Sequence, residues 1–238
     1  MLQNVRVMIE KQEPEAEEAE KEVQQEPSLE QEDLLYDPTK PMLALTFDDG
    51  PSMYTDELLD YLEEHQARAT FFVLGSNVKK RPDSIKRMAE IGCEVGNHTY
   101  AHPDLTKLKA KEIRSQIDKT NREVKNVLGY EPELVRPTYG AVNDKVKKNA
   151  PYPLIFWSVD TTDWKKDDAK SVEKYVLKHA KDGEIILLHD IHKSTVRAMK
   201  TVIPKLQDNG FQLVTVSQMA EARGVTLEKQ QKYFEFQK

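Results

Sequence analysis

The sequence predicts an α/β fold in which the short strands of a parallel sheet alternate with helices. Three observations support it: seven short apolar runs rich in strand-forming residues, helical spacing between most of them, and polar residues directly after several runs. About 190 residues follow this pattern, which is compatible with an open doubly wound sheet and with an incomplete (β/α) barrel. In both folds, ligands bind at the carboxyl ends of the strands.

The first half of the pattern starts at Pro41. A strand over residues 42–47 is stopped by an Asp-Asp-Gly-Pro turn, and residues 55–65 follow as a helix because leucines fall on one face. The remaining elements of this half are a strand at 69–74 ended by a glycine, a helix reaching residue 91, and a short strand at 94–96.

A long amphipathic helix over residues 109–128 opens the second half, because Ile113, Ile117 and Val124 lie roughly a turn apart and Gly129 provides a stop. Short apolar runs then predict four strands, at residues 133–135, 154–158, 184–188 and 212–214. Helices are expected between the last three strands, at residues 169–180 and 195–207.

The first 36 residues differ from the rest in composition. Between Glu10 and Asp33 there are 11 acidic residues and 2 basic ones, with two prolines and almost no aliphatic side chains. Such a segment cannot bury enough apolar surface to offset the entropy of ordering it. We therefore predict an acidic, disordered or loosely helical tail or stalk over residues 1–36, one folded domain over 37–224, and a C-terminal extension over 225–238.

Composition excludes several classes of protein. The 238 residues are 38% hydrophobic and 32% charged, and no apolar run reaches the ~18 residues of a membrane span. No basic segment followed by an apolar one marks a secretory signal at the start. A single cysteine, Cys93, excludes an internal disulfide framework and a thiolate zinc cluster. No basic patch with interleaved aromatic residues indicates nucleic acid binding.

Reactive side chains follow five of the predicted strands. They are Asp48 and Asp49 after the first, His98 and His102 after the third, Arg136 after the fourth, Asp160 and Asp163 after the fifth, and His189 and Asp190 after the sixth. Because the carboxyl ends of parallel strands meet at one edge, we expect these side chains on one face of the molecule. Adjacent carboxylates share a site only where the strand ends, and Gly50 and Pro51 supply that break.

The spacing of His98 and His102 allows two imidazoles to reach one metal ion. With a carboxylate as the third ligand, such a site suits zinc in a hydrolase and also ferrous iron in an oxygenase. We expect no ligand role for His65 and His179. His192 is expected to cap the following helix or to lie near a substrate groove.

Five ordered motifs resemble those of the polysaccharide deacetylases, the NodB-homology enzymes of carbohydrate esterase family 4. They are TFDDGP at residues 46–51, HTYAHP at 98–103, RPTYG at 136–140, DTTDW at 160–164 and LLHD at 187–190. The resemblance covers about residues 40–222. It implies a distorted or incomplete (β/α) barrel, in agreement with the alternation of strands and helices.

The resemblance also implies a role for each matching residue. Asp49, His98 and His102 match the ligands of one divalent metal ion, with zinc first and cobalt, nickel or manganese as alternatives. Asp48 matches the general base that takes a proton from water, and Arg136 matches the residue that pairs with and orients this base.

Four more positions match the family's catalytic and binding groups. His189 matches the general acid for the departing nitrogen, and Asp163 the carboxylate that raises the pKa of this imidazole. The backbone N–H of Tyr139 would stabilise the oxyanion, and Leu187 and Trp164 would pack around the acetate methyl group. Asp160 is expected to be a structural loop carboxylate.

The third motif departs from the family pattern at one position. Many family members carry a proline where Thr138 stands in this chain. Because proline fixes φ, we expect the loop that bears the Tyr139 amide to be less restricted here.

These matches predict a metal-dependent hydrolase that removes N-acetyl groups from N-acetylglucosamine units of a β-1,4 polysaccharide, with peptidoglycan first. The alternatives are a chitooligosaccharide deacetylase, an acetylxylan esterase, or a non-catalytic carbohydrate-binding protein of the cell wall. Intact Asp48 and His189 argue against the last of these, because binding alone needs neither a base nor an acid. Aromatic residues that could hold sugars are Tyr54, Tyr100, Tyr139, Tyr152 and Trp164.

The expected partner is the acetylated polysaccharide itself, peptidoglycan or a chitooligosaccharide, and the expected oligomeric state is a monomer. Such a substrate implies an extracellular or cell-wall-associated protein. We therefore expect the chain to be a mature form from which a membrane-proximal portion was removed, with residues 1–36 as the remnant of a stalk.

Overall fold

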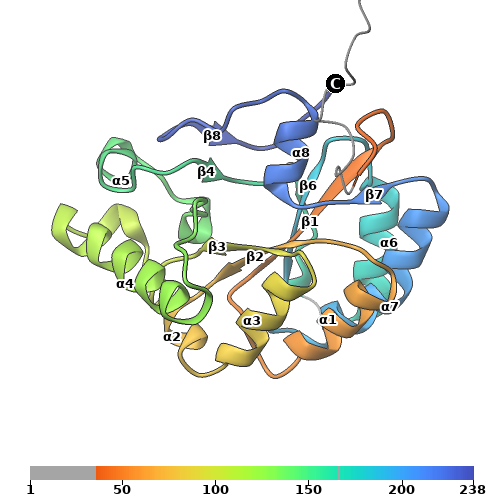
Figure 1. The fold of residues 1–238 in the computed structure, drawn as a ribbon, viewed down its shortest axis with the longest axis horizontal. Helices are drawn as coiled ribbons and strands as arrows, with labels where there is room; N and C mark the ends of the chain where they lie inside the picture. The colour runs from red at the N-terminus through yellow and green to blue at the C-terminus, as the bar shows by residue number, and fades with distance from the viewer. Residues whose placement is uncertain (1–35, 166) are drawn as a thin grey trace, which may run out of the picture. The chain divides into compact units, whose positions relative to one another are not determined.

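A parallel sheet lies at the centre of the computed structural model, which describes residues 36–165 and 167–238 (Figure 1). Its strands are β1 (Met42–Asp48), β2 (Thr70–Val73), β3 (Glu94–Asn97), β4 (Leu154–Ile155), β5 (Val159–Asp160), β6 (Ile185–His189), β7 (Gln212–Leu213) and β8 (Lys232–Tyr233). The main sheet has the order β3-β2-β1-β6-β5, and β7 pairs with the first two residues of β1. All seven residues of β1 are buried, which explains its continuous apolar sequence.

The sheet curves into an incomplete barrel. Beyond β3, Val135 bridges Asn97 on one side and Leu154 on the other, and Leu154 begins β4, which pairs with β8. An isolated antiparallel bridge between Glu184 and Glu235 then leads back to β6. The barrel is therefore distorted and is not closed by regular strands. The predicted α/β class, with a distorted or incomplete barrel, is confirmed.

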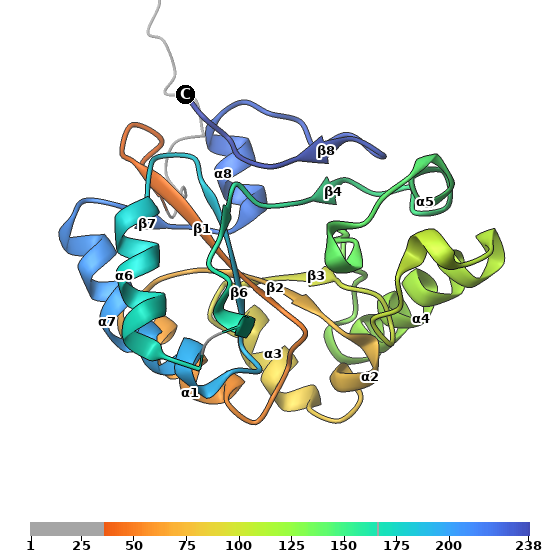
Figure 2. The same ribbon diagram turned by 180° about the vertical axis from the view of Figure 1, so that it is seen from behind.

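Helices surround this sheet, and the last of them packs with Met42 and Ala44 on its inner face, whereas most of the others cover its outer face. They are α1 (Thr55–Glu64), α2 (Gly75–Val78), α3 (Pro82–Glu90), α4 (Ala110–Leu128), α5 (Asp144–Asn149), α6 (Ala169–His179), α7 (Lys193–Asp208) and α8 (Val216–Ala222), with short 3-10 turns at Leu105–Lys107, Thr138–Gly140 and Asp163–Lys165. α6 and α7 lie side by side, as Figures 1 and 2 show from opposite directions, and α1 packs against α7. Leucines of α1, Met88 of α3 and Ile203 of α7 share one buried core with Phe47 of β1.

Two expected strands differ from the structure. Residues 133–135 form no regular strand, and only Val135 takes part in bridges. The strand expected at 154–158 ends at Ile155, because the backbone changes its partner there. The N–H of Phe156 donates to the carbonyl of Tyr233, whereas the N–H of Ser158 donates to the carbonyl of Ile185.

The two ends of the predicted domain also differ from expectation. Residues 225–238, set apart as an extension, supply β8 and bury Phe236 in a core cluster with Met42 and Ile155. The predicted tail lies outside the described residues except for Tyr36, which is buried and donates a hydrogen bond to Glu221 at 2.9 Å. Among the helices of the described residues, none has the length and apolar character to cross a membrane.

Candidate active site

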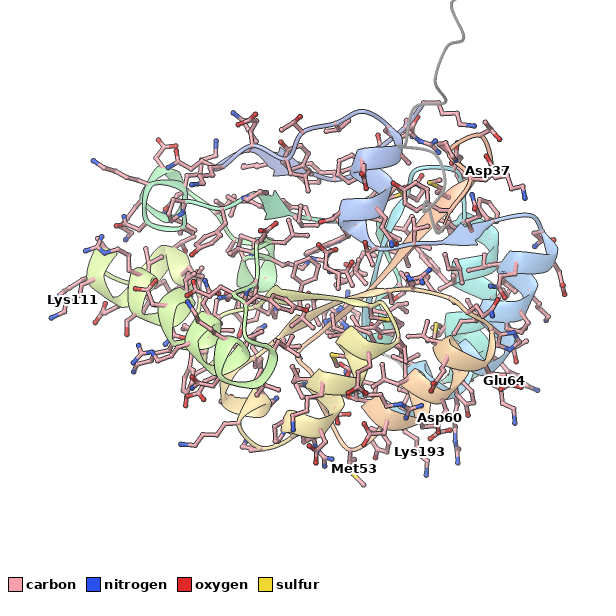
Figure 3. The ribbon with its side chains drawn as sticks, viewed as in Figure 1. Asp37, Met53, Asp60, Glu64, Lys111 and Lys193 are labelled. Atoms are coloured by element: carbon pink, nitrogen blue, oxygen red, sulfur yellow. The ribbon has the colours of Figure 1, made fainter. Side chains whose placement is uncertain are left out.

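The loops that follow β1, β3 and β6 gather the predicted reactive residues at the carboxyl ends of these strands. β1 and β6 are neighbours, and Asp48 lies opposite His189 in their register. Figure 3 shows Met53 and Lys193, from the segments after β1 and β6, at the lower edge of the view, while Asp37, which precedes β1, lies at the upper edge. The reactive residues therefore share one end of the sheet.

Two adjacent carboxylates reach this end together because the chain turns at Asp49. Asp48 is the last residue of β1, whereas Asp49 has φ 72° and so leaves the extended conformation. Aspartate tolerates this left-handed region better than most residues with a Cβ atom. Sequence reasoning expected the break at Gly50 and Pro51, and the structure shows that it begins one residue earlier.

Asp49, His98 and His102 form a cluster whose ligand atoms all lie within 4.8 Å of one another. The Oδ1 atom of Asp49 lies 3.3 Å from Nε2 of His102 and 3.7 Å from Nε2 of His98. Nδ1 of His98 donates to the backbone carbonyl of Arg136 at 2.7 Å, which leaves the Nε2 lone pair of the neutral ring facing the cluster. Burial lowers the pKa of His102, which favours the neutral, ligating form.

The same cluster fits a cation. The Asp49 Oδ1 atom is buried, and it has no hydrogen-bond partner among the residues that the structure describes. A buried carboxylate oxygen that faces two imidazole nitrogens and has no hydrogen-bond partner is unfavourable unless a positive charge joins them. Two imidazoles and one carboxylate form a donor set typical of zinc and related divalent ions.

Arg136 is fully buried and holds Asp48 in place. Its Nη1 atom donates to Oδ1 of Asp48 at 2.8 Å and to Oγ1 of Thr46 at 2.7 Å, while Nε and Nη2 donate to the carbonyls of Ile155 and Phe156. The guanidinium lies over the ring of Phe72, at 4.1 Å from the centroid. Burial lowers the pKa of Arg136, and the Asp48 carboxylate opposes this shift.

The carboxylate of Asp163 accepts three hydrogen bonds, two of which hold His189. Oδ1 accepts from Nδ1 of His189 at 2.8 Å, and Oδ2 accepts from the His189 backbone N–H and from the hydroxyl of Thr195. Burial disfavours the imidazolium, but the hydrogen bond and charge of Asp163, together with the charges of Asp48 and Asp49, raise the pKa of His189 to about 9. Burial favours the protonated form of Asp163, whereas its contact with His189 favours the ionised form. The pKa of Asp163 is lowered overall.

One cavity of about 400 Å³ adjoins eight of the ten predicted site residues. Arg136 and Asp163 lie behind this lining and contact Asp48 and His189. Leu187 is almost completely buried, whereas Tyr139 and Trp164 expose 68% and 53% of their surface, so the aromatic residues form the rim.

Four further residues line the cavity: Pro137, Trp157, Asp160 and His192. Asp160, the last residue of β5, also accepts a hydrogen bond from the backbone N–H of Thr162. His192 lies at the N-cap of α7 without a side-chain capping bond. Trp157 was not singled out from the sequence, because an aromatic residue within an apolar run that predicts a strand gives no signal that distinguishes core from site.

The geometry matches the comparisons with known proteins. A profile of the polysaccharide deacetylase family matches residues 36–152. The chain is 46% identical over 198 residues to the peptidoglycan-N-acetylglucosamine deacetylase PgdA of Listeria monocytogenes, which covers 83% of this chain and 42% of that protein. It is 40% identical over 188 residues to a peptidoglycan-N-acetylglucosamine deacetylase of Bacillus cereus, covering 76% and 68% of the two chains.

A solved structure of the peptidoglycan deacetylase PdaC from Bacillus subtilis is similar to this fold, with a TM-score of 0.78 and 44% identity over 79% of this chain and 94% of that one. PdaC is named a peptidoglycan-N-acetylmuramic acid deacetylase. The chain spans about two fifths of the full length of PdaC and PgdA. Because the chain is 40% identical to the Bacillus cereus protein and covers 68% of that protein's length, it belongs to the polysaccharide deacetylase family.

Proposed function

We propose that this chain is a metal-dependent hydrolase that removes the N-acetyl group from N-acetylglucosamine units of peptidoglycan. One observation carries the proposal. A carboxylate held by Arg136 and an imidazole held by Asp163 face the same cavity as the three-residue cluster of Asp49, His98 and His102. Binding a sugar requires none of these paired groups, whereas hydrolysis of an amide requires a base, an acid and charge stabilisation.

The Asp49, His98 and His102 cluster would hold one divalent ion, zinc in the first place. When bound there, such an ion would lower the pKa of a water molecule and polarise the acetyl carbonyl. Asp49 contributes the negative charge and the two histidines contribute neutral nitrogen ligands. Cobalt, nickel and manganese accept the same donor set, so the metal has to be identified by measurement.

Asp48 acts as the general base of the proposed reaction. Its Oδ1 atom is engaged by Arg136, which leaves Oδ2, at 3.6 Å from Nε2 of His98, to accept a proton from the attacking water. The water oxygen forms a bond to the acetyl carbon, and the carbonyl oxygen takes the electron pair. The backbone N–H of Tyr139 donates a hydrogen bond to this developing oxyanion.

His189 acts as the general acid that completes the reaction. Its Nδ1–H is held by Asp163, so Nε2 carries the proton that passes to the sugar nitrogen as the carbon–nitrogen bond breaks. The products are acetate and a free amine on the sugar. Asp48 gains one proton and His189 loses one, so the site resets when Asp48 releases its proton and His189 takes one up.

The names of the relatives support peptidoglycan as the substrate but differ in which of its sugars is deacetylated. PgdA and the Bacillus cereus protein are named for N-acetylglucosamine, whereas PdaC is named for N-acetylmuramic acid. A cavity with exposed aromatic residues at its rim suits a sugar polymer that extends beyond one unit. Such a substrate lies in the cell wall, and we propose that the chain acts outside the membrane.

The test is acetate release from peptidoglycan fragments and from chitooligosaccharides, with added zinc and with a chelator. Asp48→Asn is the matched control, because its amide oxygen still accepts from Arg136 but cannot take a proton. We expect zinc-dependent release that the chelator and this variant abolish. Mass spectrometry of the product then locates the free amine on one of the two sugars. No release from peptidoglycan by the zinc-loaded protein would contradict the proposal.

A further inference from the structure

Thr138 connects two loops of the site through its side chain. The residue is buried, and its hydroxyl donates a hydrogen bond of 2.5 Å to the backbone carbonyl of Pro103. Pro103 directly follows His102 in the sequence, and Tyr139 directly follows Thr138. The bond therefore ties the loop that carries a ligand of the proposed metal to the loop that carries the Tyr139 amide.

The Tyr139 loop has a backbone that needs such support. Tyr139 has φ 59° and Gly140 has φ 62°, so two successive residues adopt the left-handed conformation, which tyrosine rarely adopts. Strained conformations of this kind persist only where the surroundings fix them. The N–H groups of Gly140 and Ala141 donate to the carbonyls of Pro137 and Thr138, which closes the turn.

The Tyr139 amide itself is free to donate. Within residues 36–165 and 167–238, no backbone or side-chain oxygen accepts a hydrogen bond from it. The ring of Tyr139 lies edge-on to that of His102, with 4.5 Å between the ring centroids. The ring contact and the Thr138 bond therefore restrain the loop through two adjacent side chains.

We propose that Thr138 is a positioning residue, whose hydroxyl bond to the Pro103 carbonyl holds the Tyr139 N–H in place relative to His102. The inference rests on the proposed function, in which this N–H binds the oxyanion. A proline restrains its own φ through its ring, whereas threonine leaves φ free, so the restraint here comes from the bond to the neighbouring loop. The β-branched side chain adds stiffness about χ1.

Three substitutions test the role. Thr138→Val keeps the shape and removes the hydroxyl, Thr138→Ser keeps the hydroxyl, and Thr138→Pro replaces the bond by a fixed φ. Proline suits the position because Pro137, with ψ 135°, already has the extended conformation that a following proline requires. We expect Thr138→Val to lower kcat by about 10- to 100-fold. This decrease does not exceed the one caused by removing a whole oxyanion donor. The serine and proline variants are expected to keep kcat within about threefold of the unchanged chain.

Two further readouts separate positioning from a general loss of structure. KM and the zinc dissociation constant of Thr138→Val, measured by competition with a chromogenic chelator, are expected to stay within about twofold, because the bond acts on the amide rather than on the ligands. In the metal-free full chain, the amides of Gly140 and Ala141 are expected to exchange with solvent about tenfold faster in the valine variant. This exchange measurement does not depend on turnover.

The outcomes are distinguishable. Unchanged kcat and unchanged amide exchange in Thr138→Val would overturn the inference. Zinc binding that weakens in step with kcat would also overturn it, since the bond would then act on His102. A proline variant as slow as the valine variant would overturn it as well. Absence of acetate release by the unchanged chain would contradict the proposed function instead, and the exchange data would still decide whether Thr138 holds the loop.

Discussion

His98 and Arg136 are joined by a hydrogen bond of 2.7 Å between the imidazole Nδ1 and the backbone carbonyl of the arginine. The side chain of the same arginine donates to Asp48 at 2.8 Å. One residue therefore orients a candidate metal ligand with its backbone and the proposed base with its side chain. Because a substitution changes only the side chain, the two effects can be separated by experiment.

Replacing Arg136 with lysine is expected to impair the base while leaving the metal ligands intact. A lysine ammonium cannot reach Asp48, Thr46 and two carbonyls at once, so buried acceptors lose their donors. We expect kcat to fall by about 100-fold. The free energy of unfolding should fall by about 2–3 kcal/mol. Steady-state kinetics and chemical unfolding measure these effects.

The matched control is Arg122→Lys, at an exposed position of α4, which should change neither quantity. Zinc affinity should be retained in Arg136→Lys, because the backbone carbonyl still accepts from His98. An Arg136→Lys protein with unchanged kcat would show that Asp48 does not need its partner.

The pH dependence of kcat should report the Asp163–His189 pair. The pKa of His189 is raised to about 9, so the proton that it donates is present below this pH and lost above it. The stability that the pair contributes through His189 is likewise complete below the ordinary pKa of 6.5 and lost as the pH rises through about 9. We expect kcat to decline on the alkaline side as this proton is lost.

Asp163→Asn should move this alkaline limb to lower pH. Without the carboxylate charge, burial is the dominant remaining influence, and it favours the neutral imidazole. An amide also has a single acceptor oxygen, so it cannot accept all three hydrogen bonds that the two carboxylate oxygens accept from His189 and Thr195. Kinetics between pH 5 and 10 test the shift, with exposed Asp167→Asn as the control. An unmoved alkaline limb in Asp163→Asn would show that another group controls it.

The sequence predicted the site most successfully where reactive side chains come directly after a strand. The carboxyl ends of β1 and β6 are adjacent because these strands pair in parallel, so Asp48 and His189 meet without any detail of packing. The positions of strands and long helices follow from apolar spacing in the same way. The order of the motifs along the chain therefore predicts eight of the residues that line the cavity, whereas Trp157 gave no such signal.

The remaining features depend on contacts between distant segments. The left-handed turn at Asp49, the bond from His98 to the Arg136 carbonyl and the bond from Thr195 to Asp163 arise from tertiary packing, which local spacing does not encode. The strand β8 was missed for a related reason. A two-residue strand is defined by its partner β4, and its own sequence is too short to show a period.

Zinc should stabilise the chain against heat through the Asp49, His98 and His102 cluster. A ligand that binds only the folded state adds about 2.7 kcal/mol when its free concentration is 100 times its dissociation constant. We therefore expect zinc to raise Tm and a chelator to reverse the increase, as followed by differential scanning calorimetry. His102→Ala should remove most of this shift, whereas His65→Ala should preserve it. A full zinc-dependent shift in His102→Ala would place the metal elsewhere.

The acyl group that the cavity accepts should depend on Leu187. This side chain exposes only 4% of its surface and lines the cavity from β6, next to the proposed acid His189. Leu187→Ala removes three carbon atoms from the wall, and one methylene in a hydrophobic pocket changes selectivity by about 10- to 200-fold. We expect the ratio of kcat/KM for N-propionyl over N-acetyl glucosamine oligomers to rise by at least about tenfold.

Leu188→Ala is the matched control for this prediction. Leu188 is fully buried in the core cluster on the other face of the same strand, so its truncation leaves a similar void away from the cavity. Both variants should lose about 2–4 kcal/mol of stability, and only the first should change the acyl preference. A selectivity change of equal size in both would mean that general loosening of β6, rather than the shape of the cavity wall, determines which acyl group is accepted.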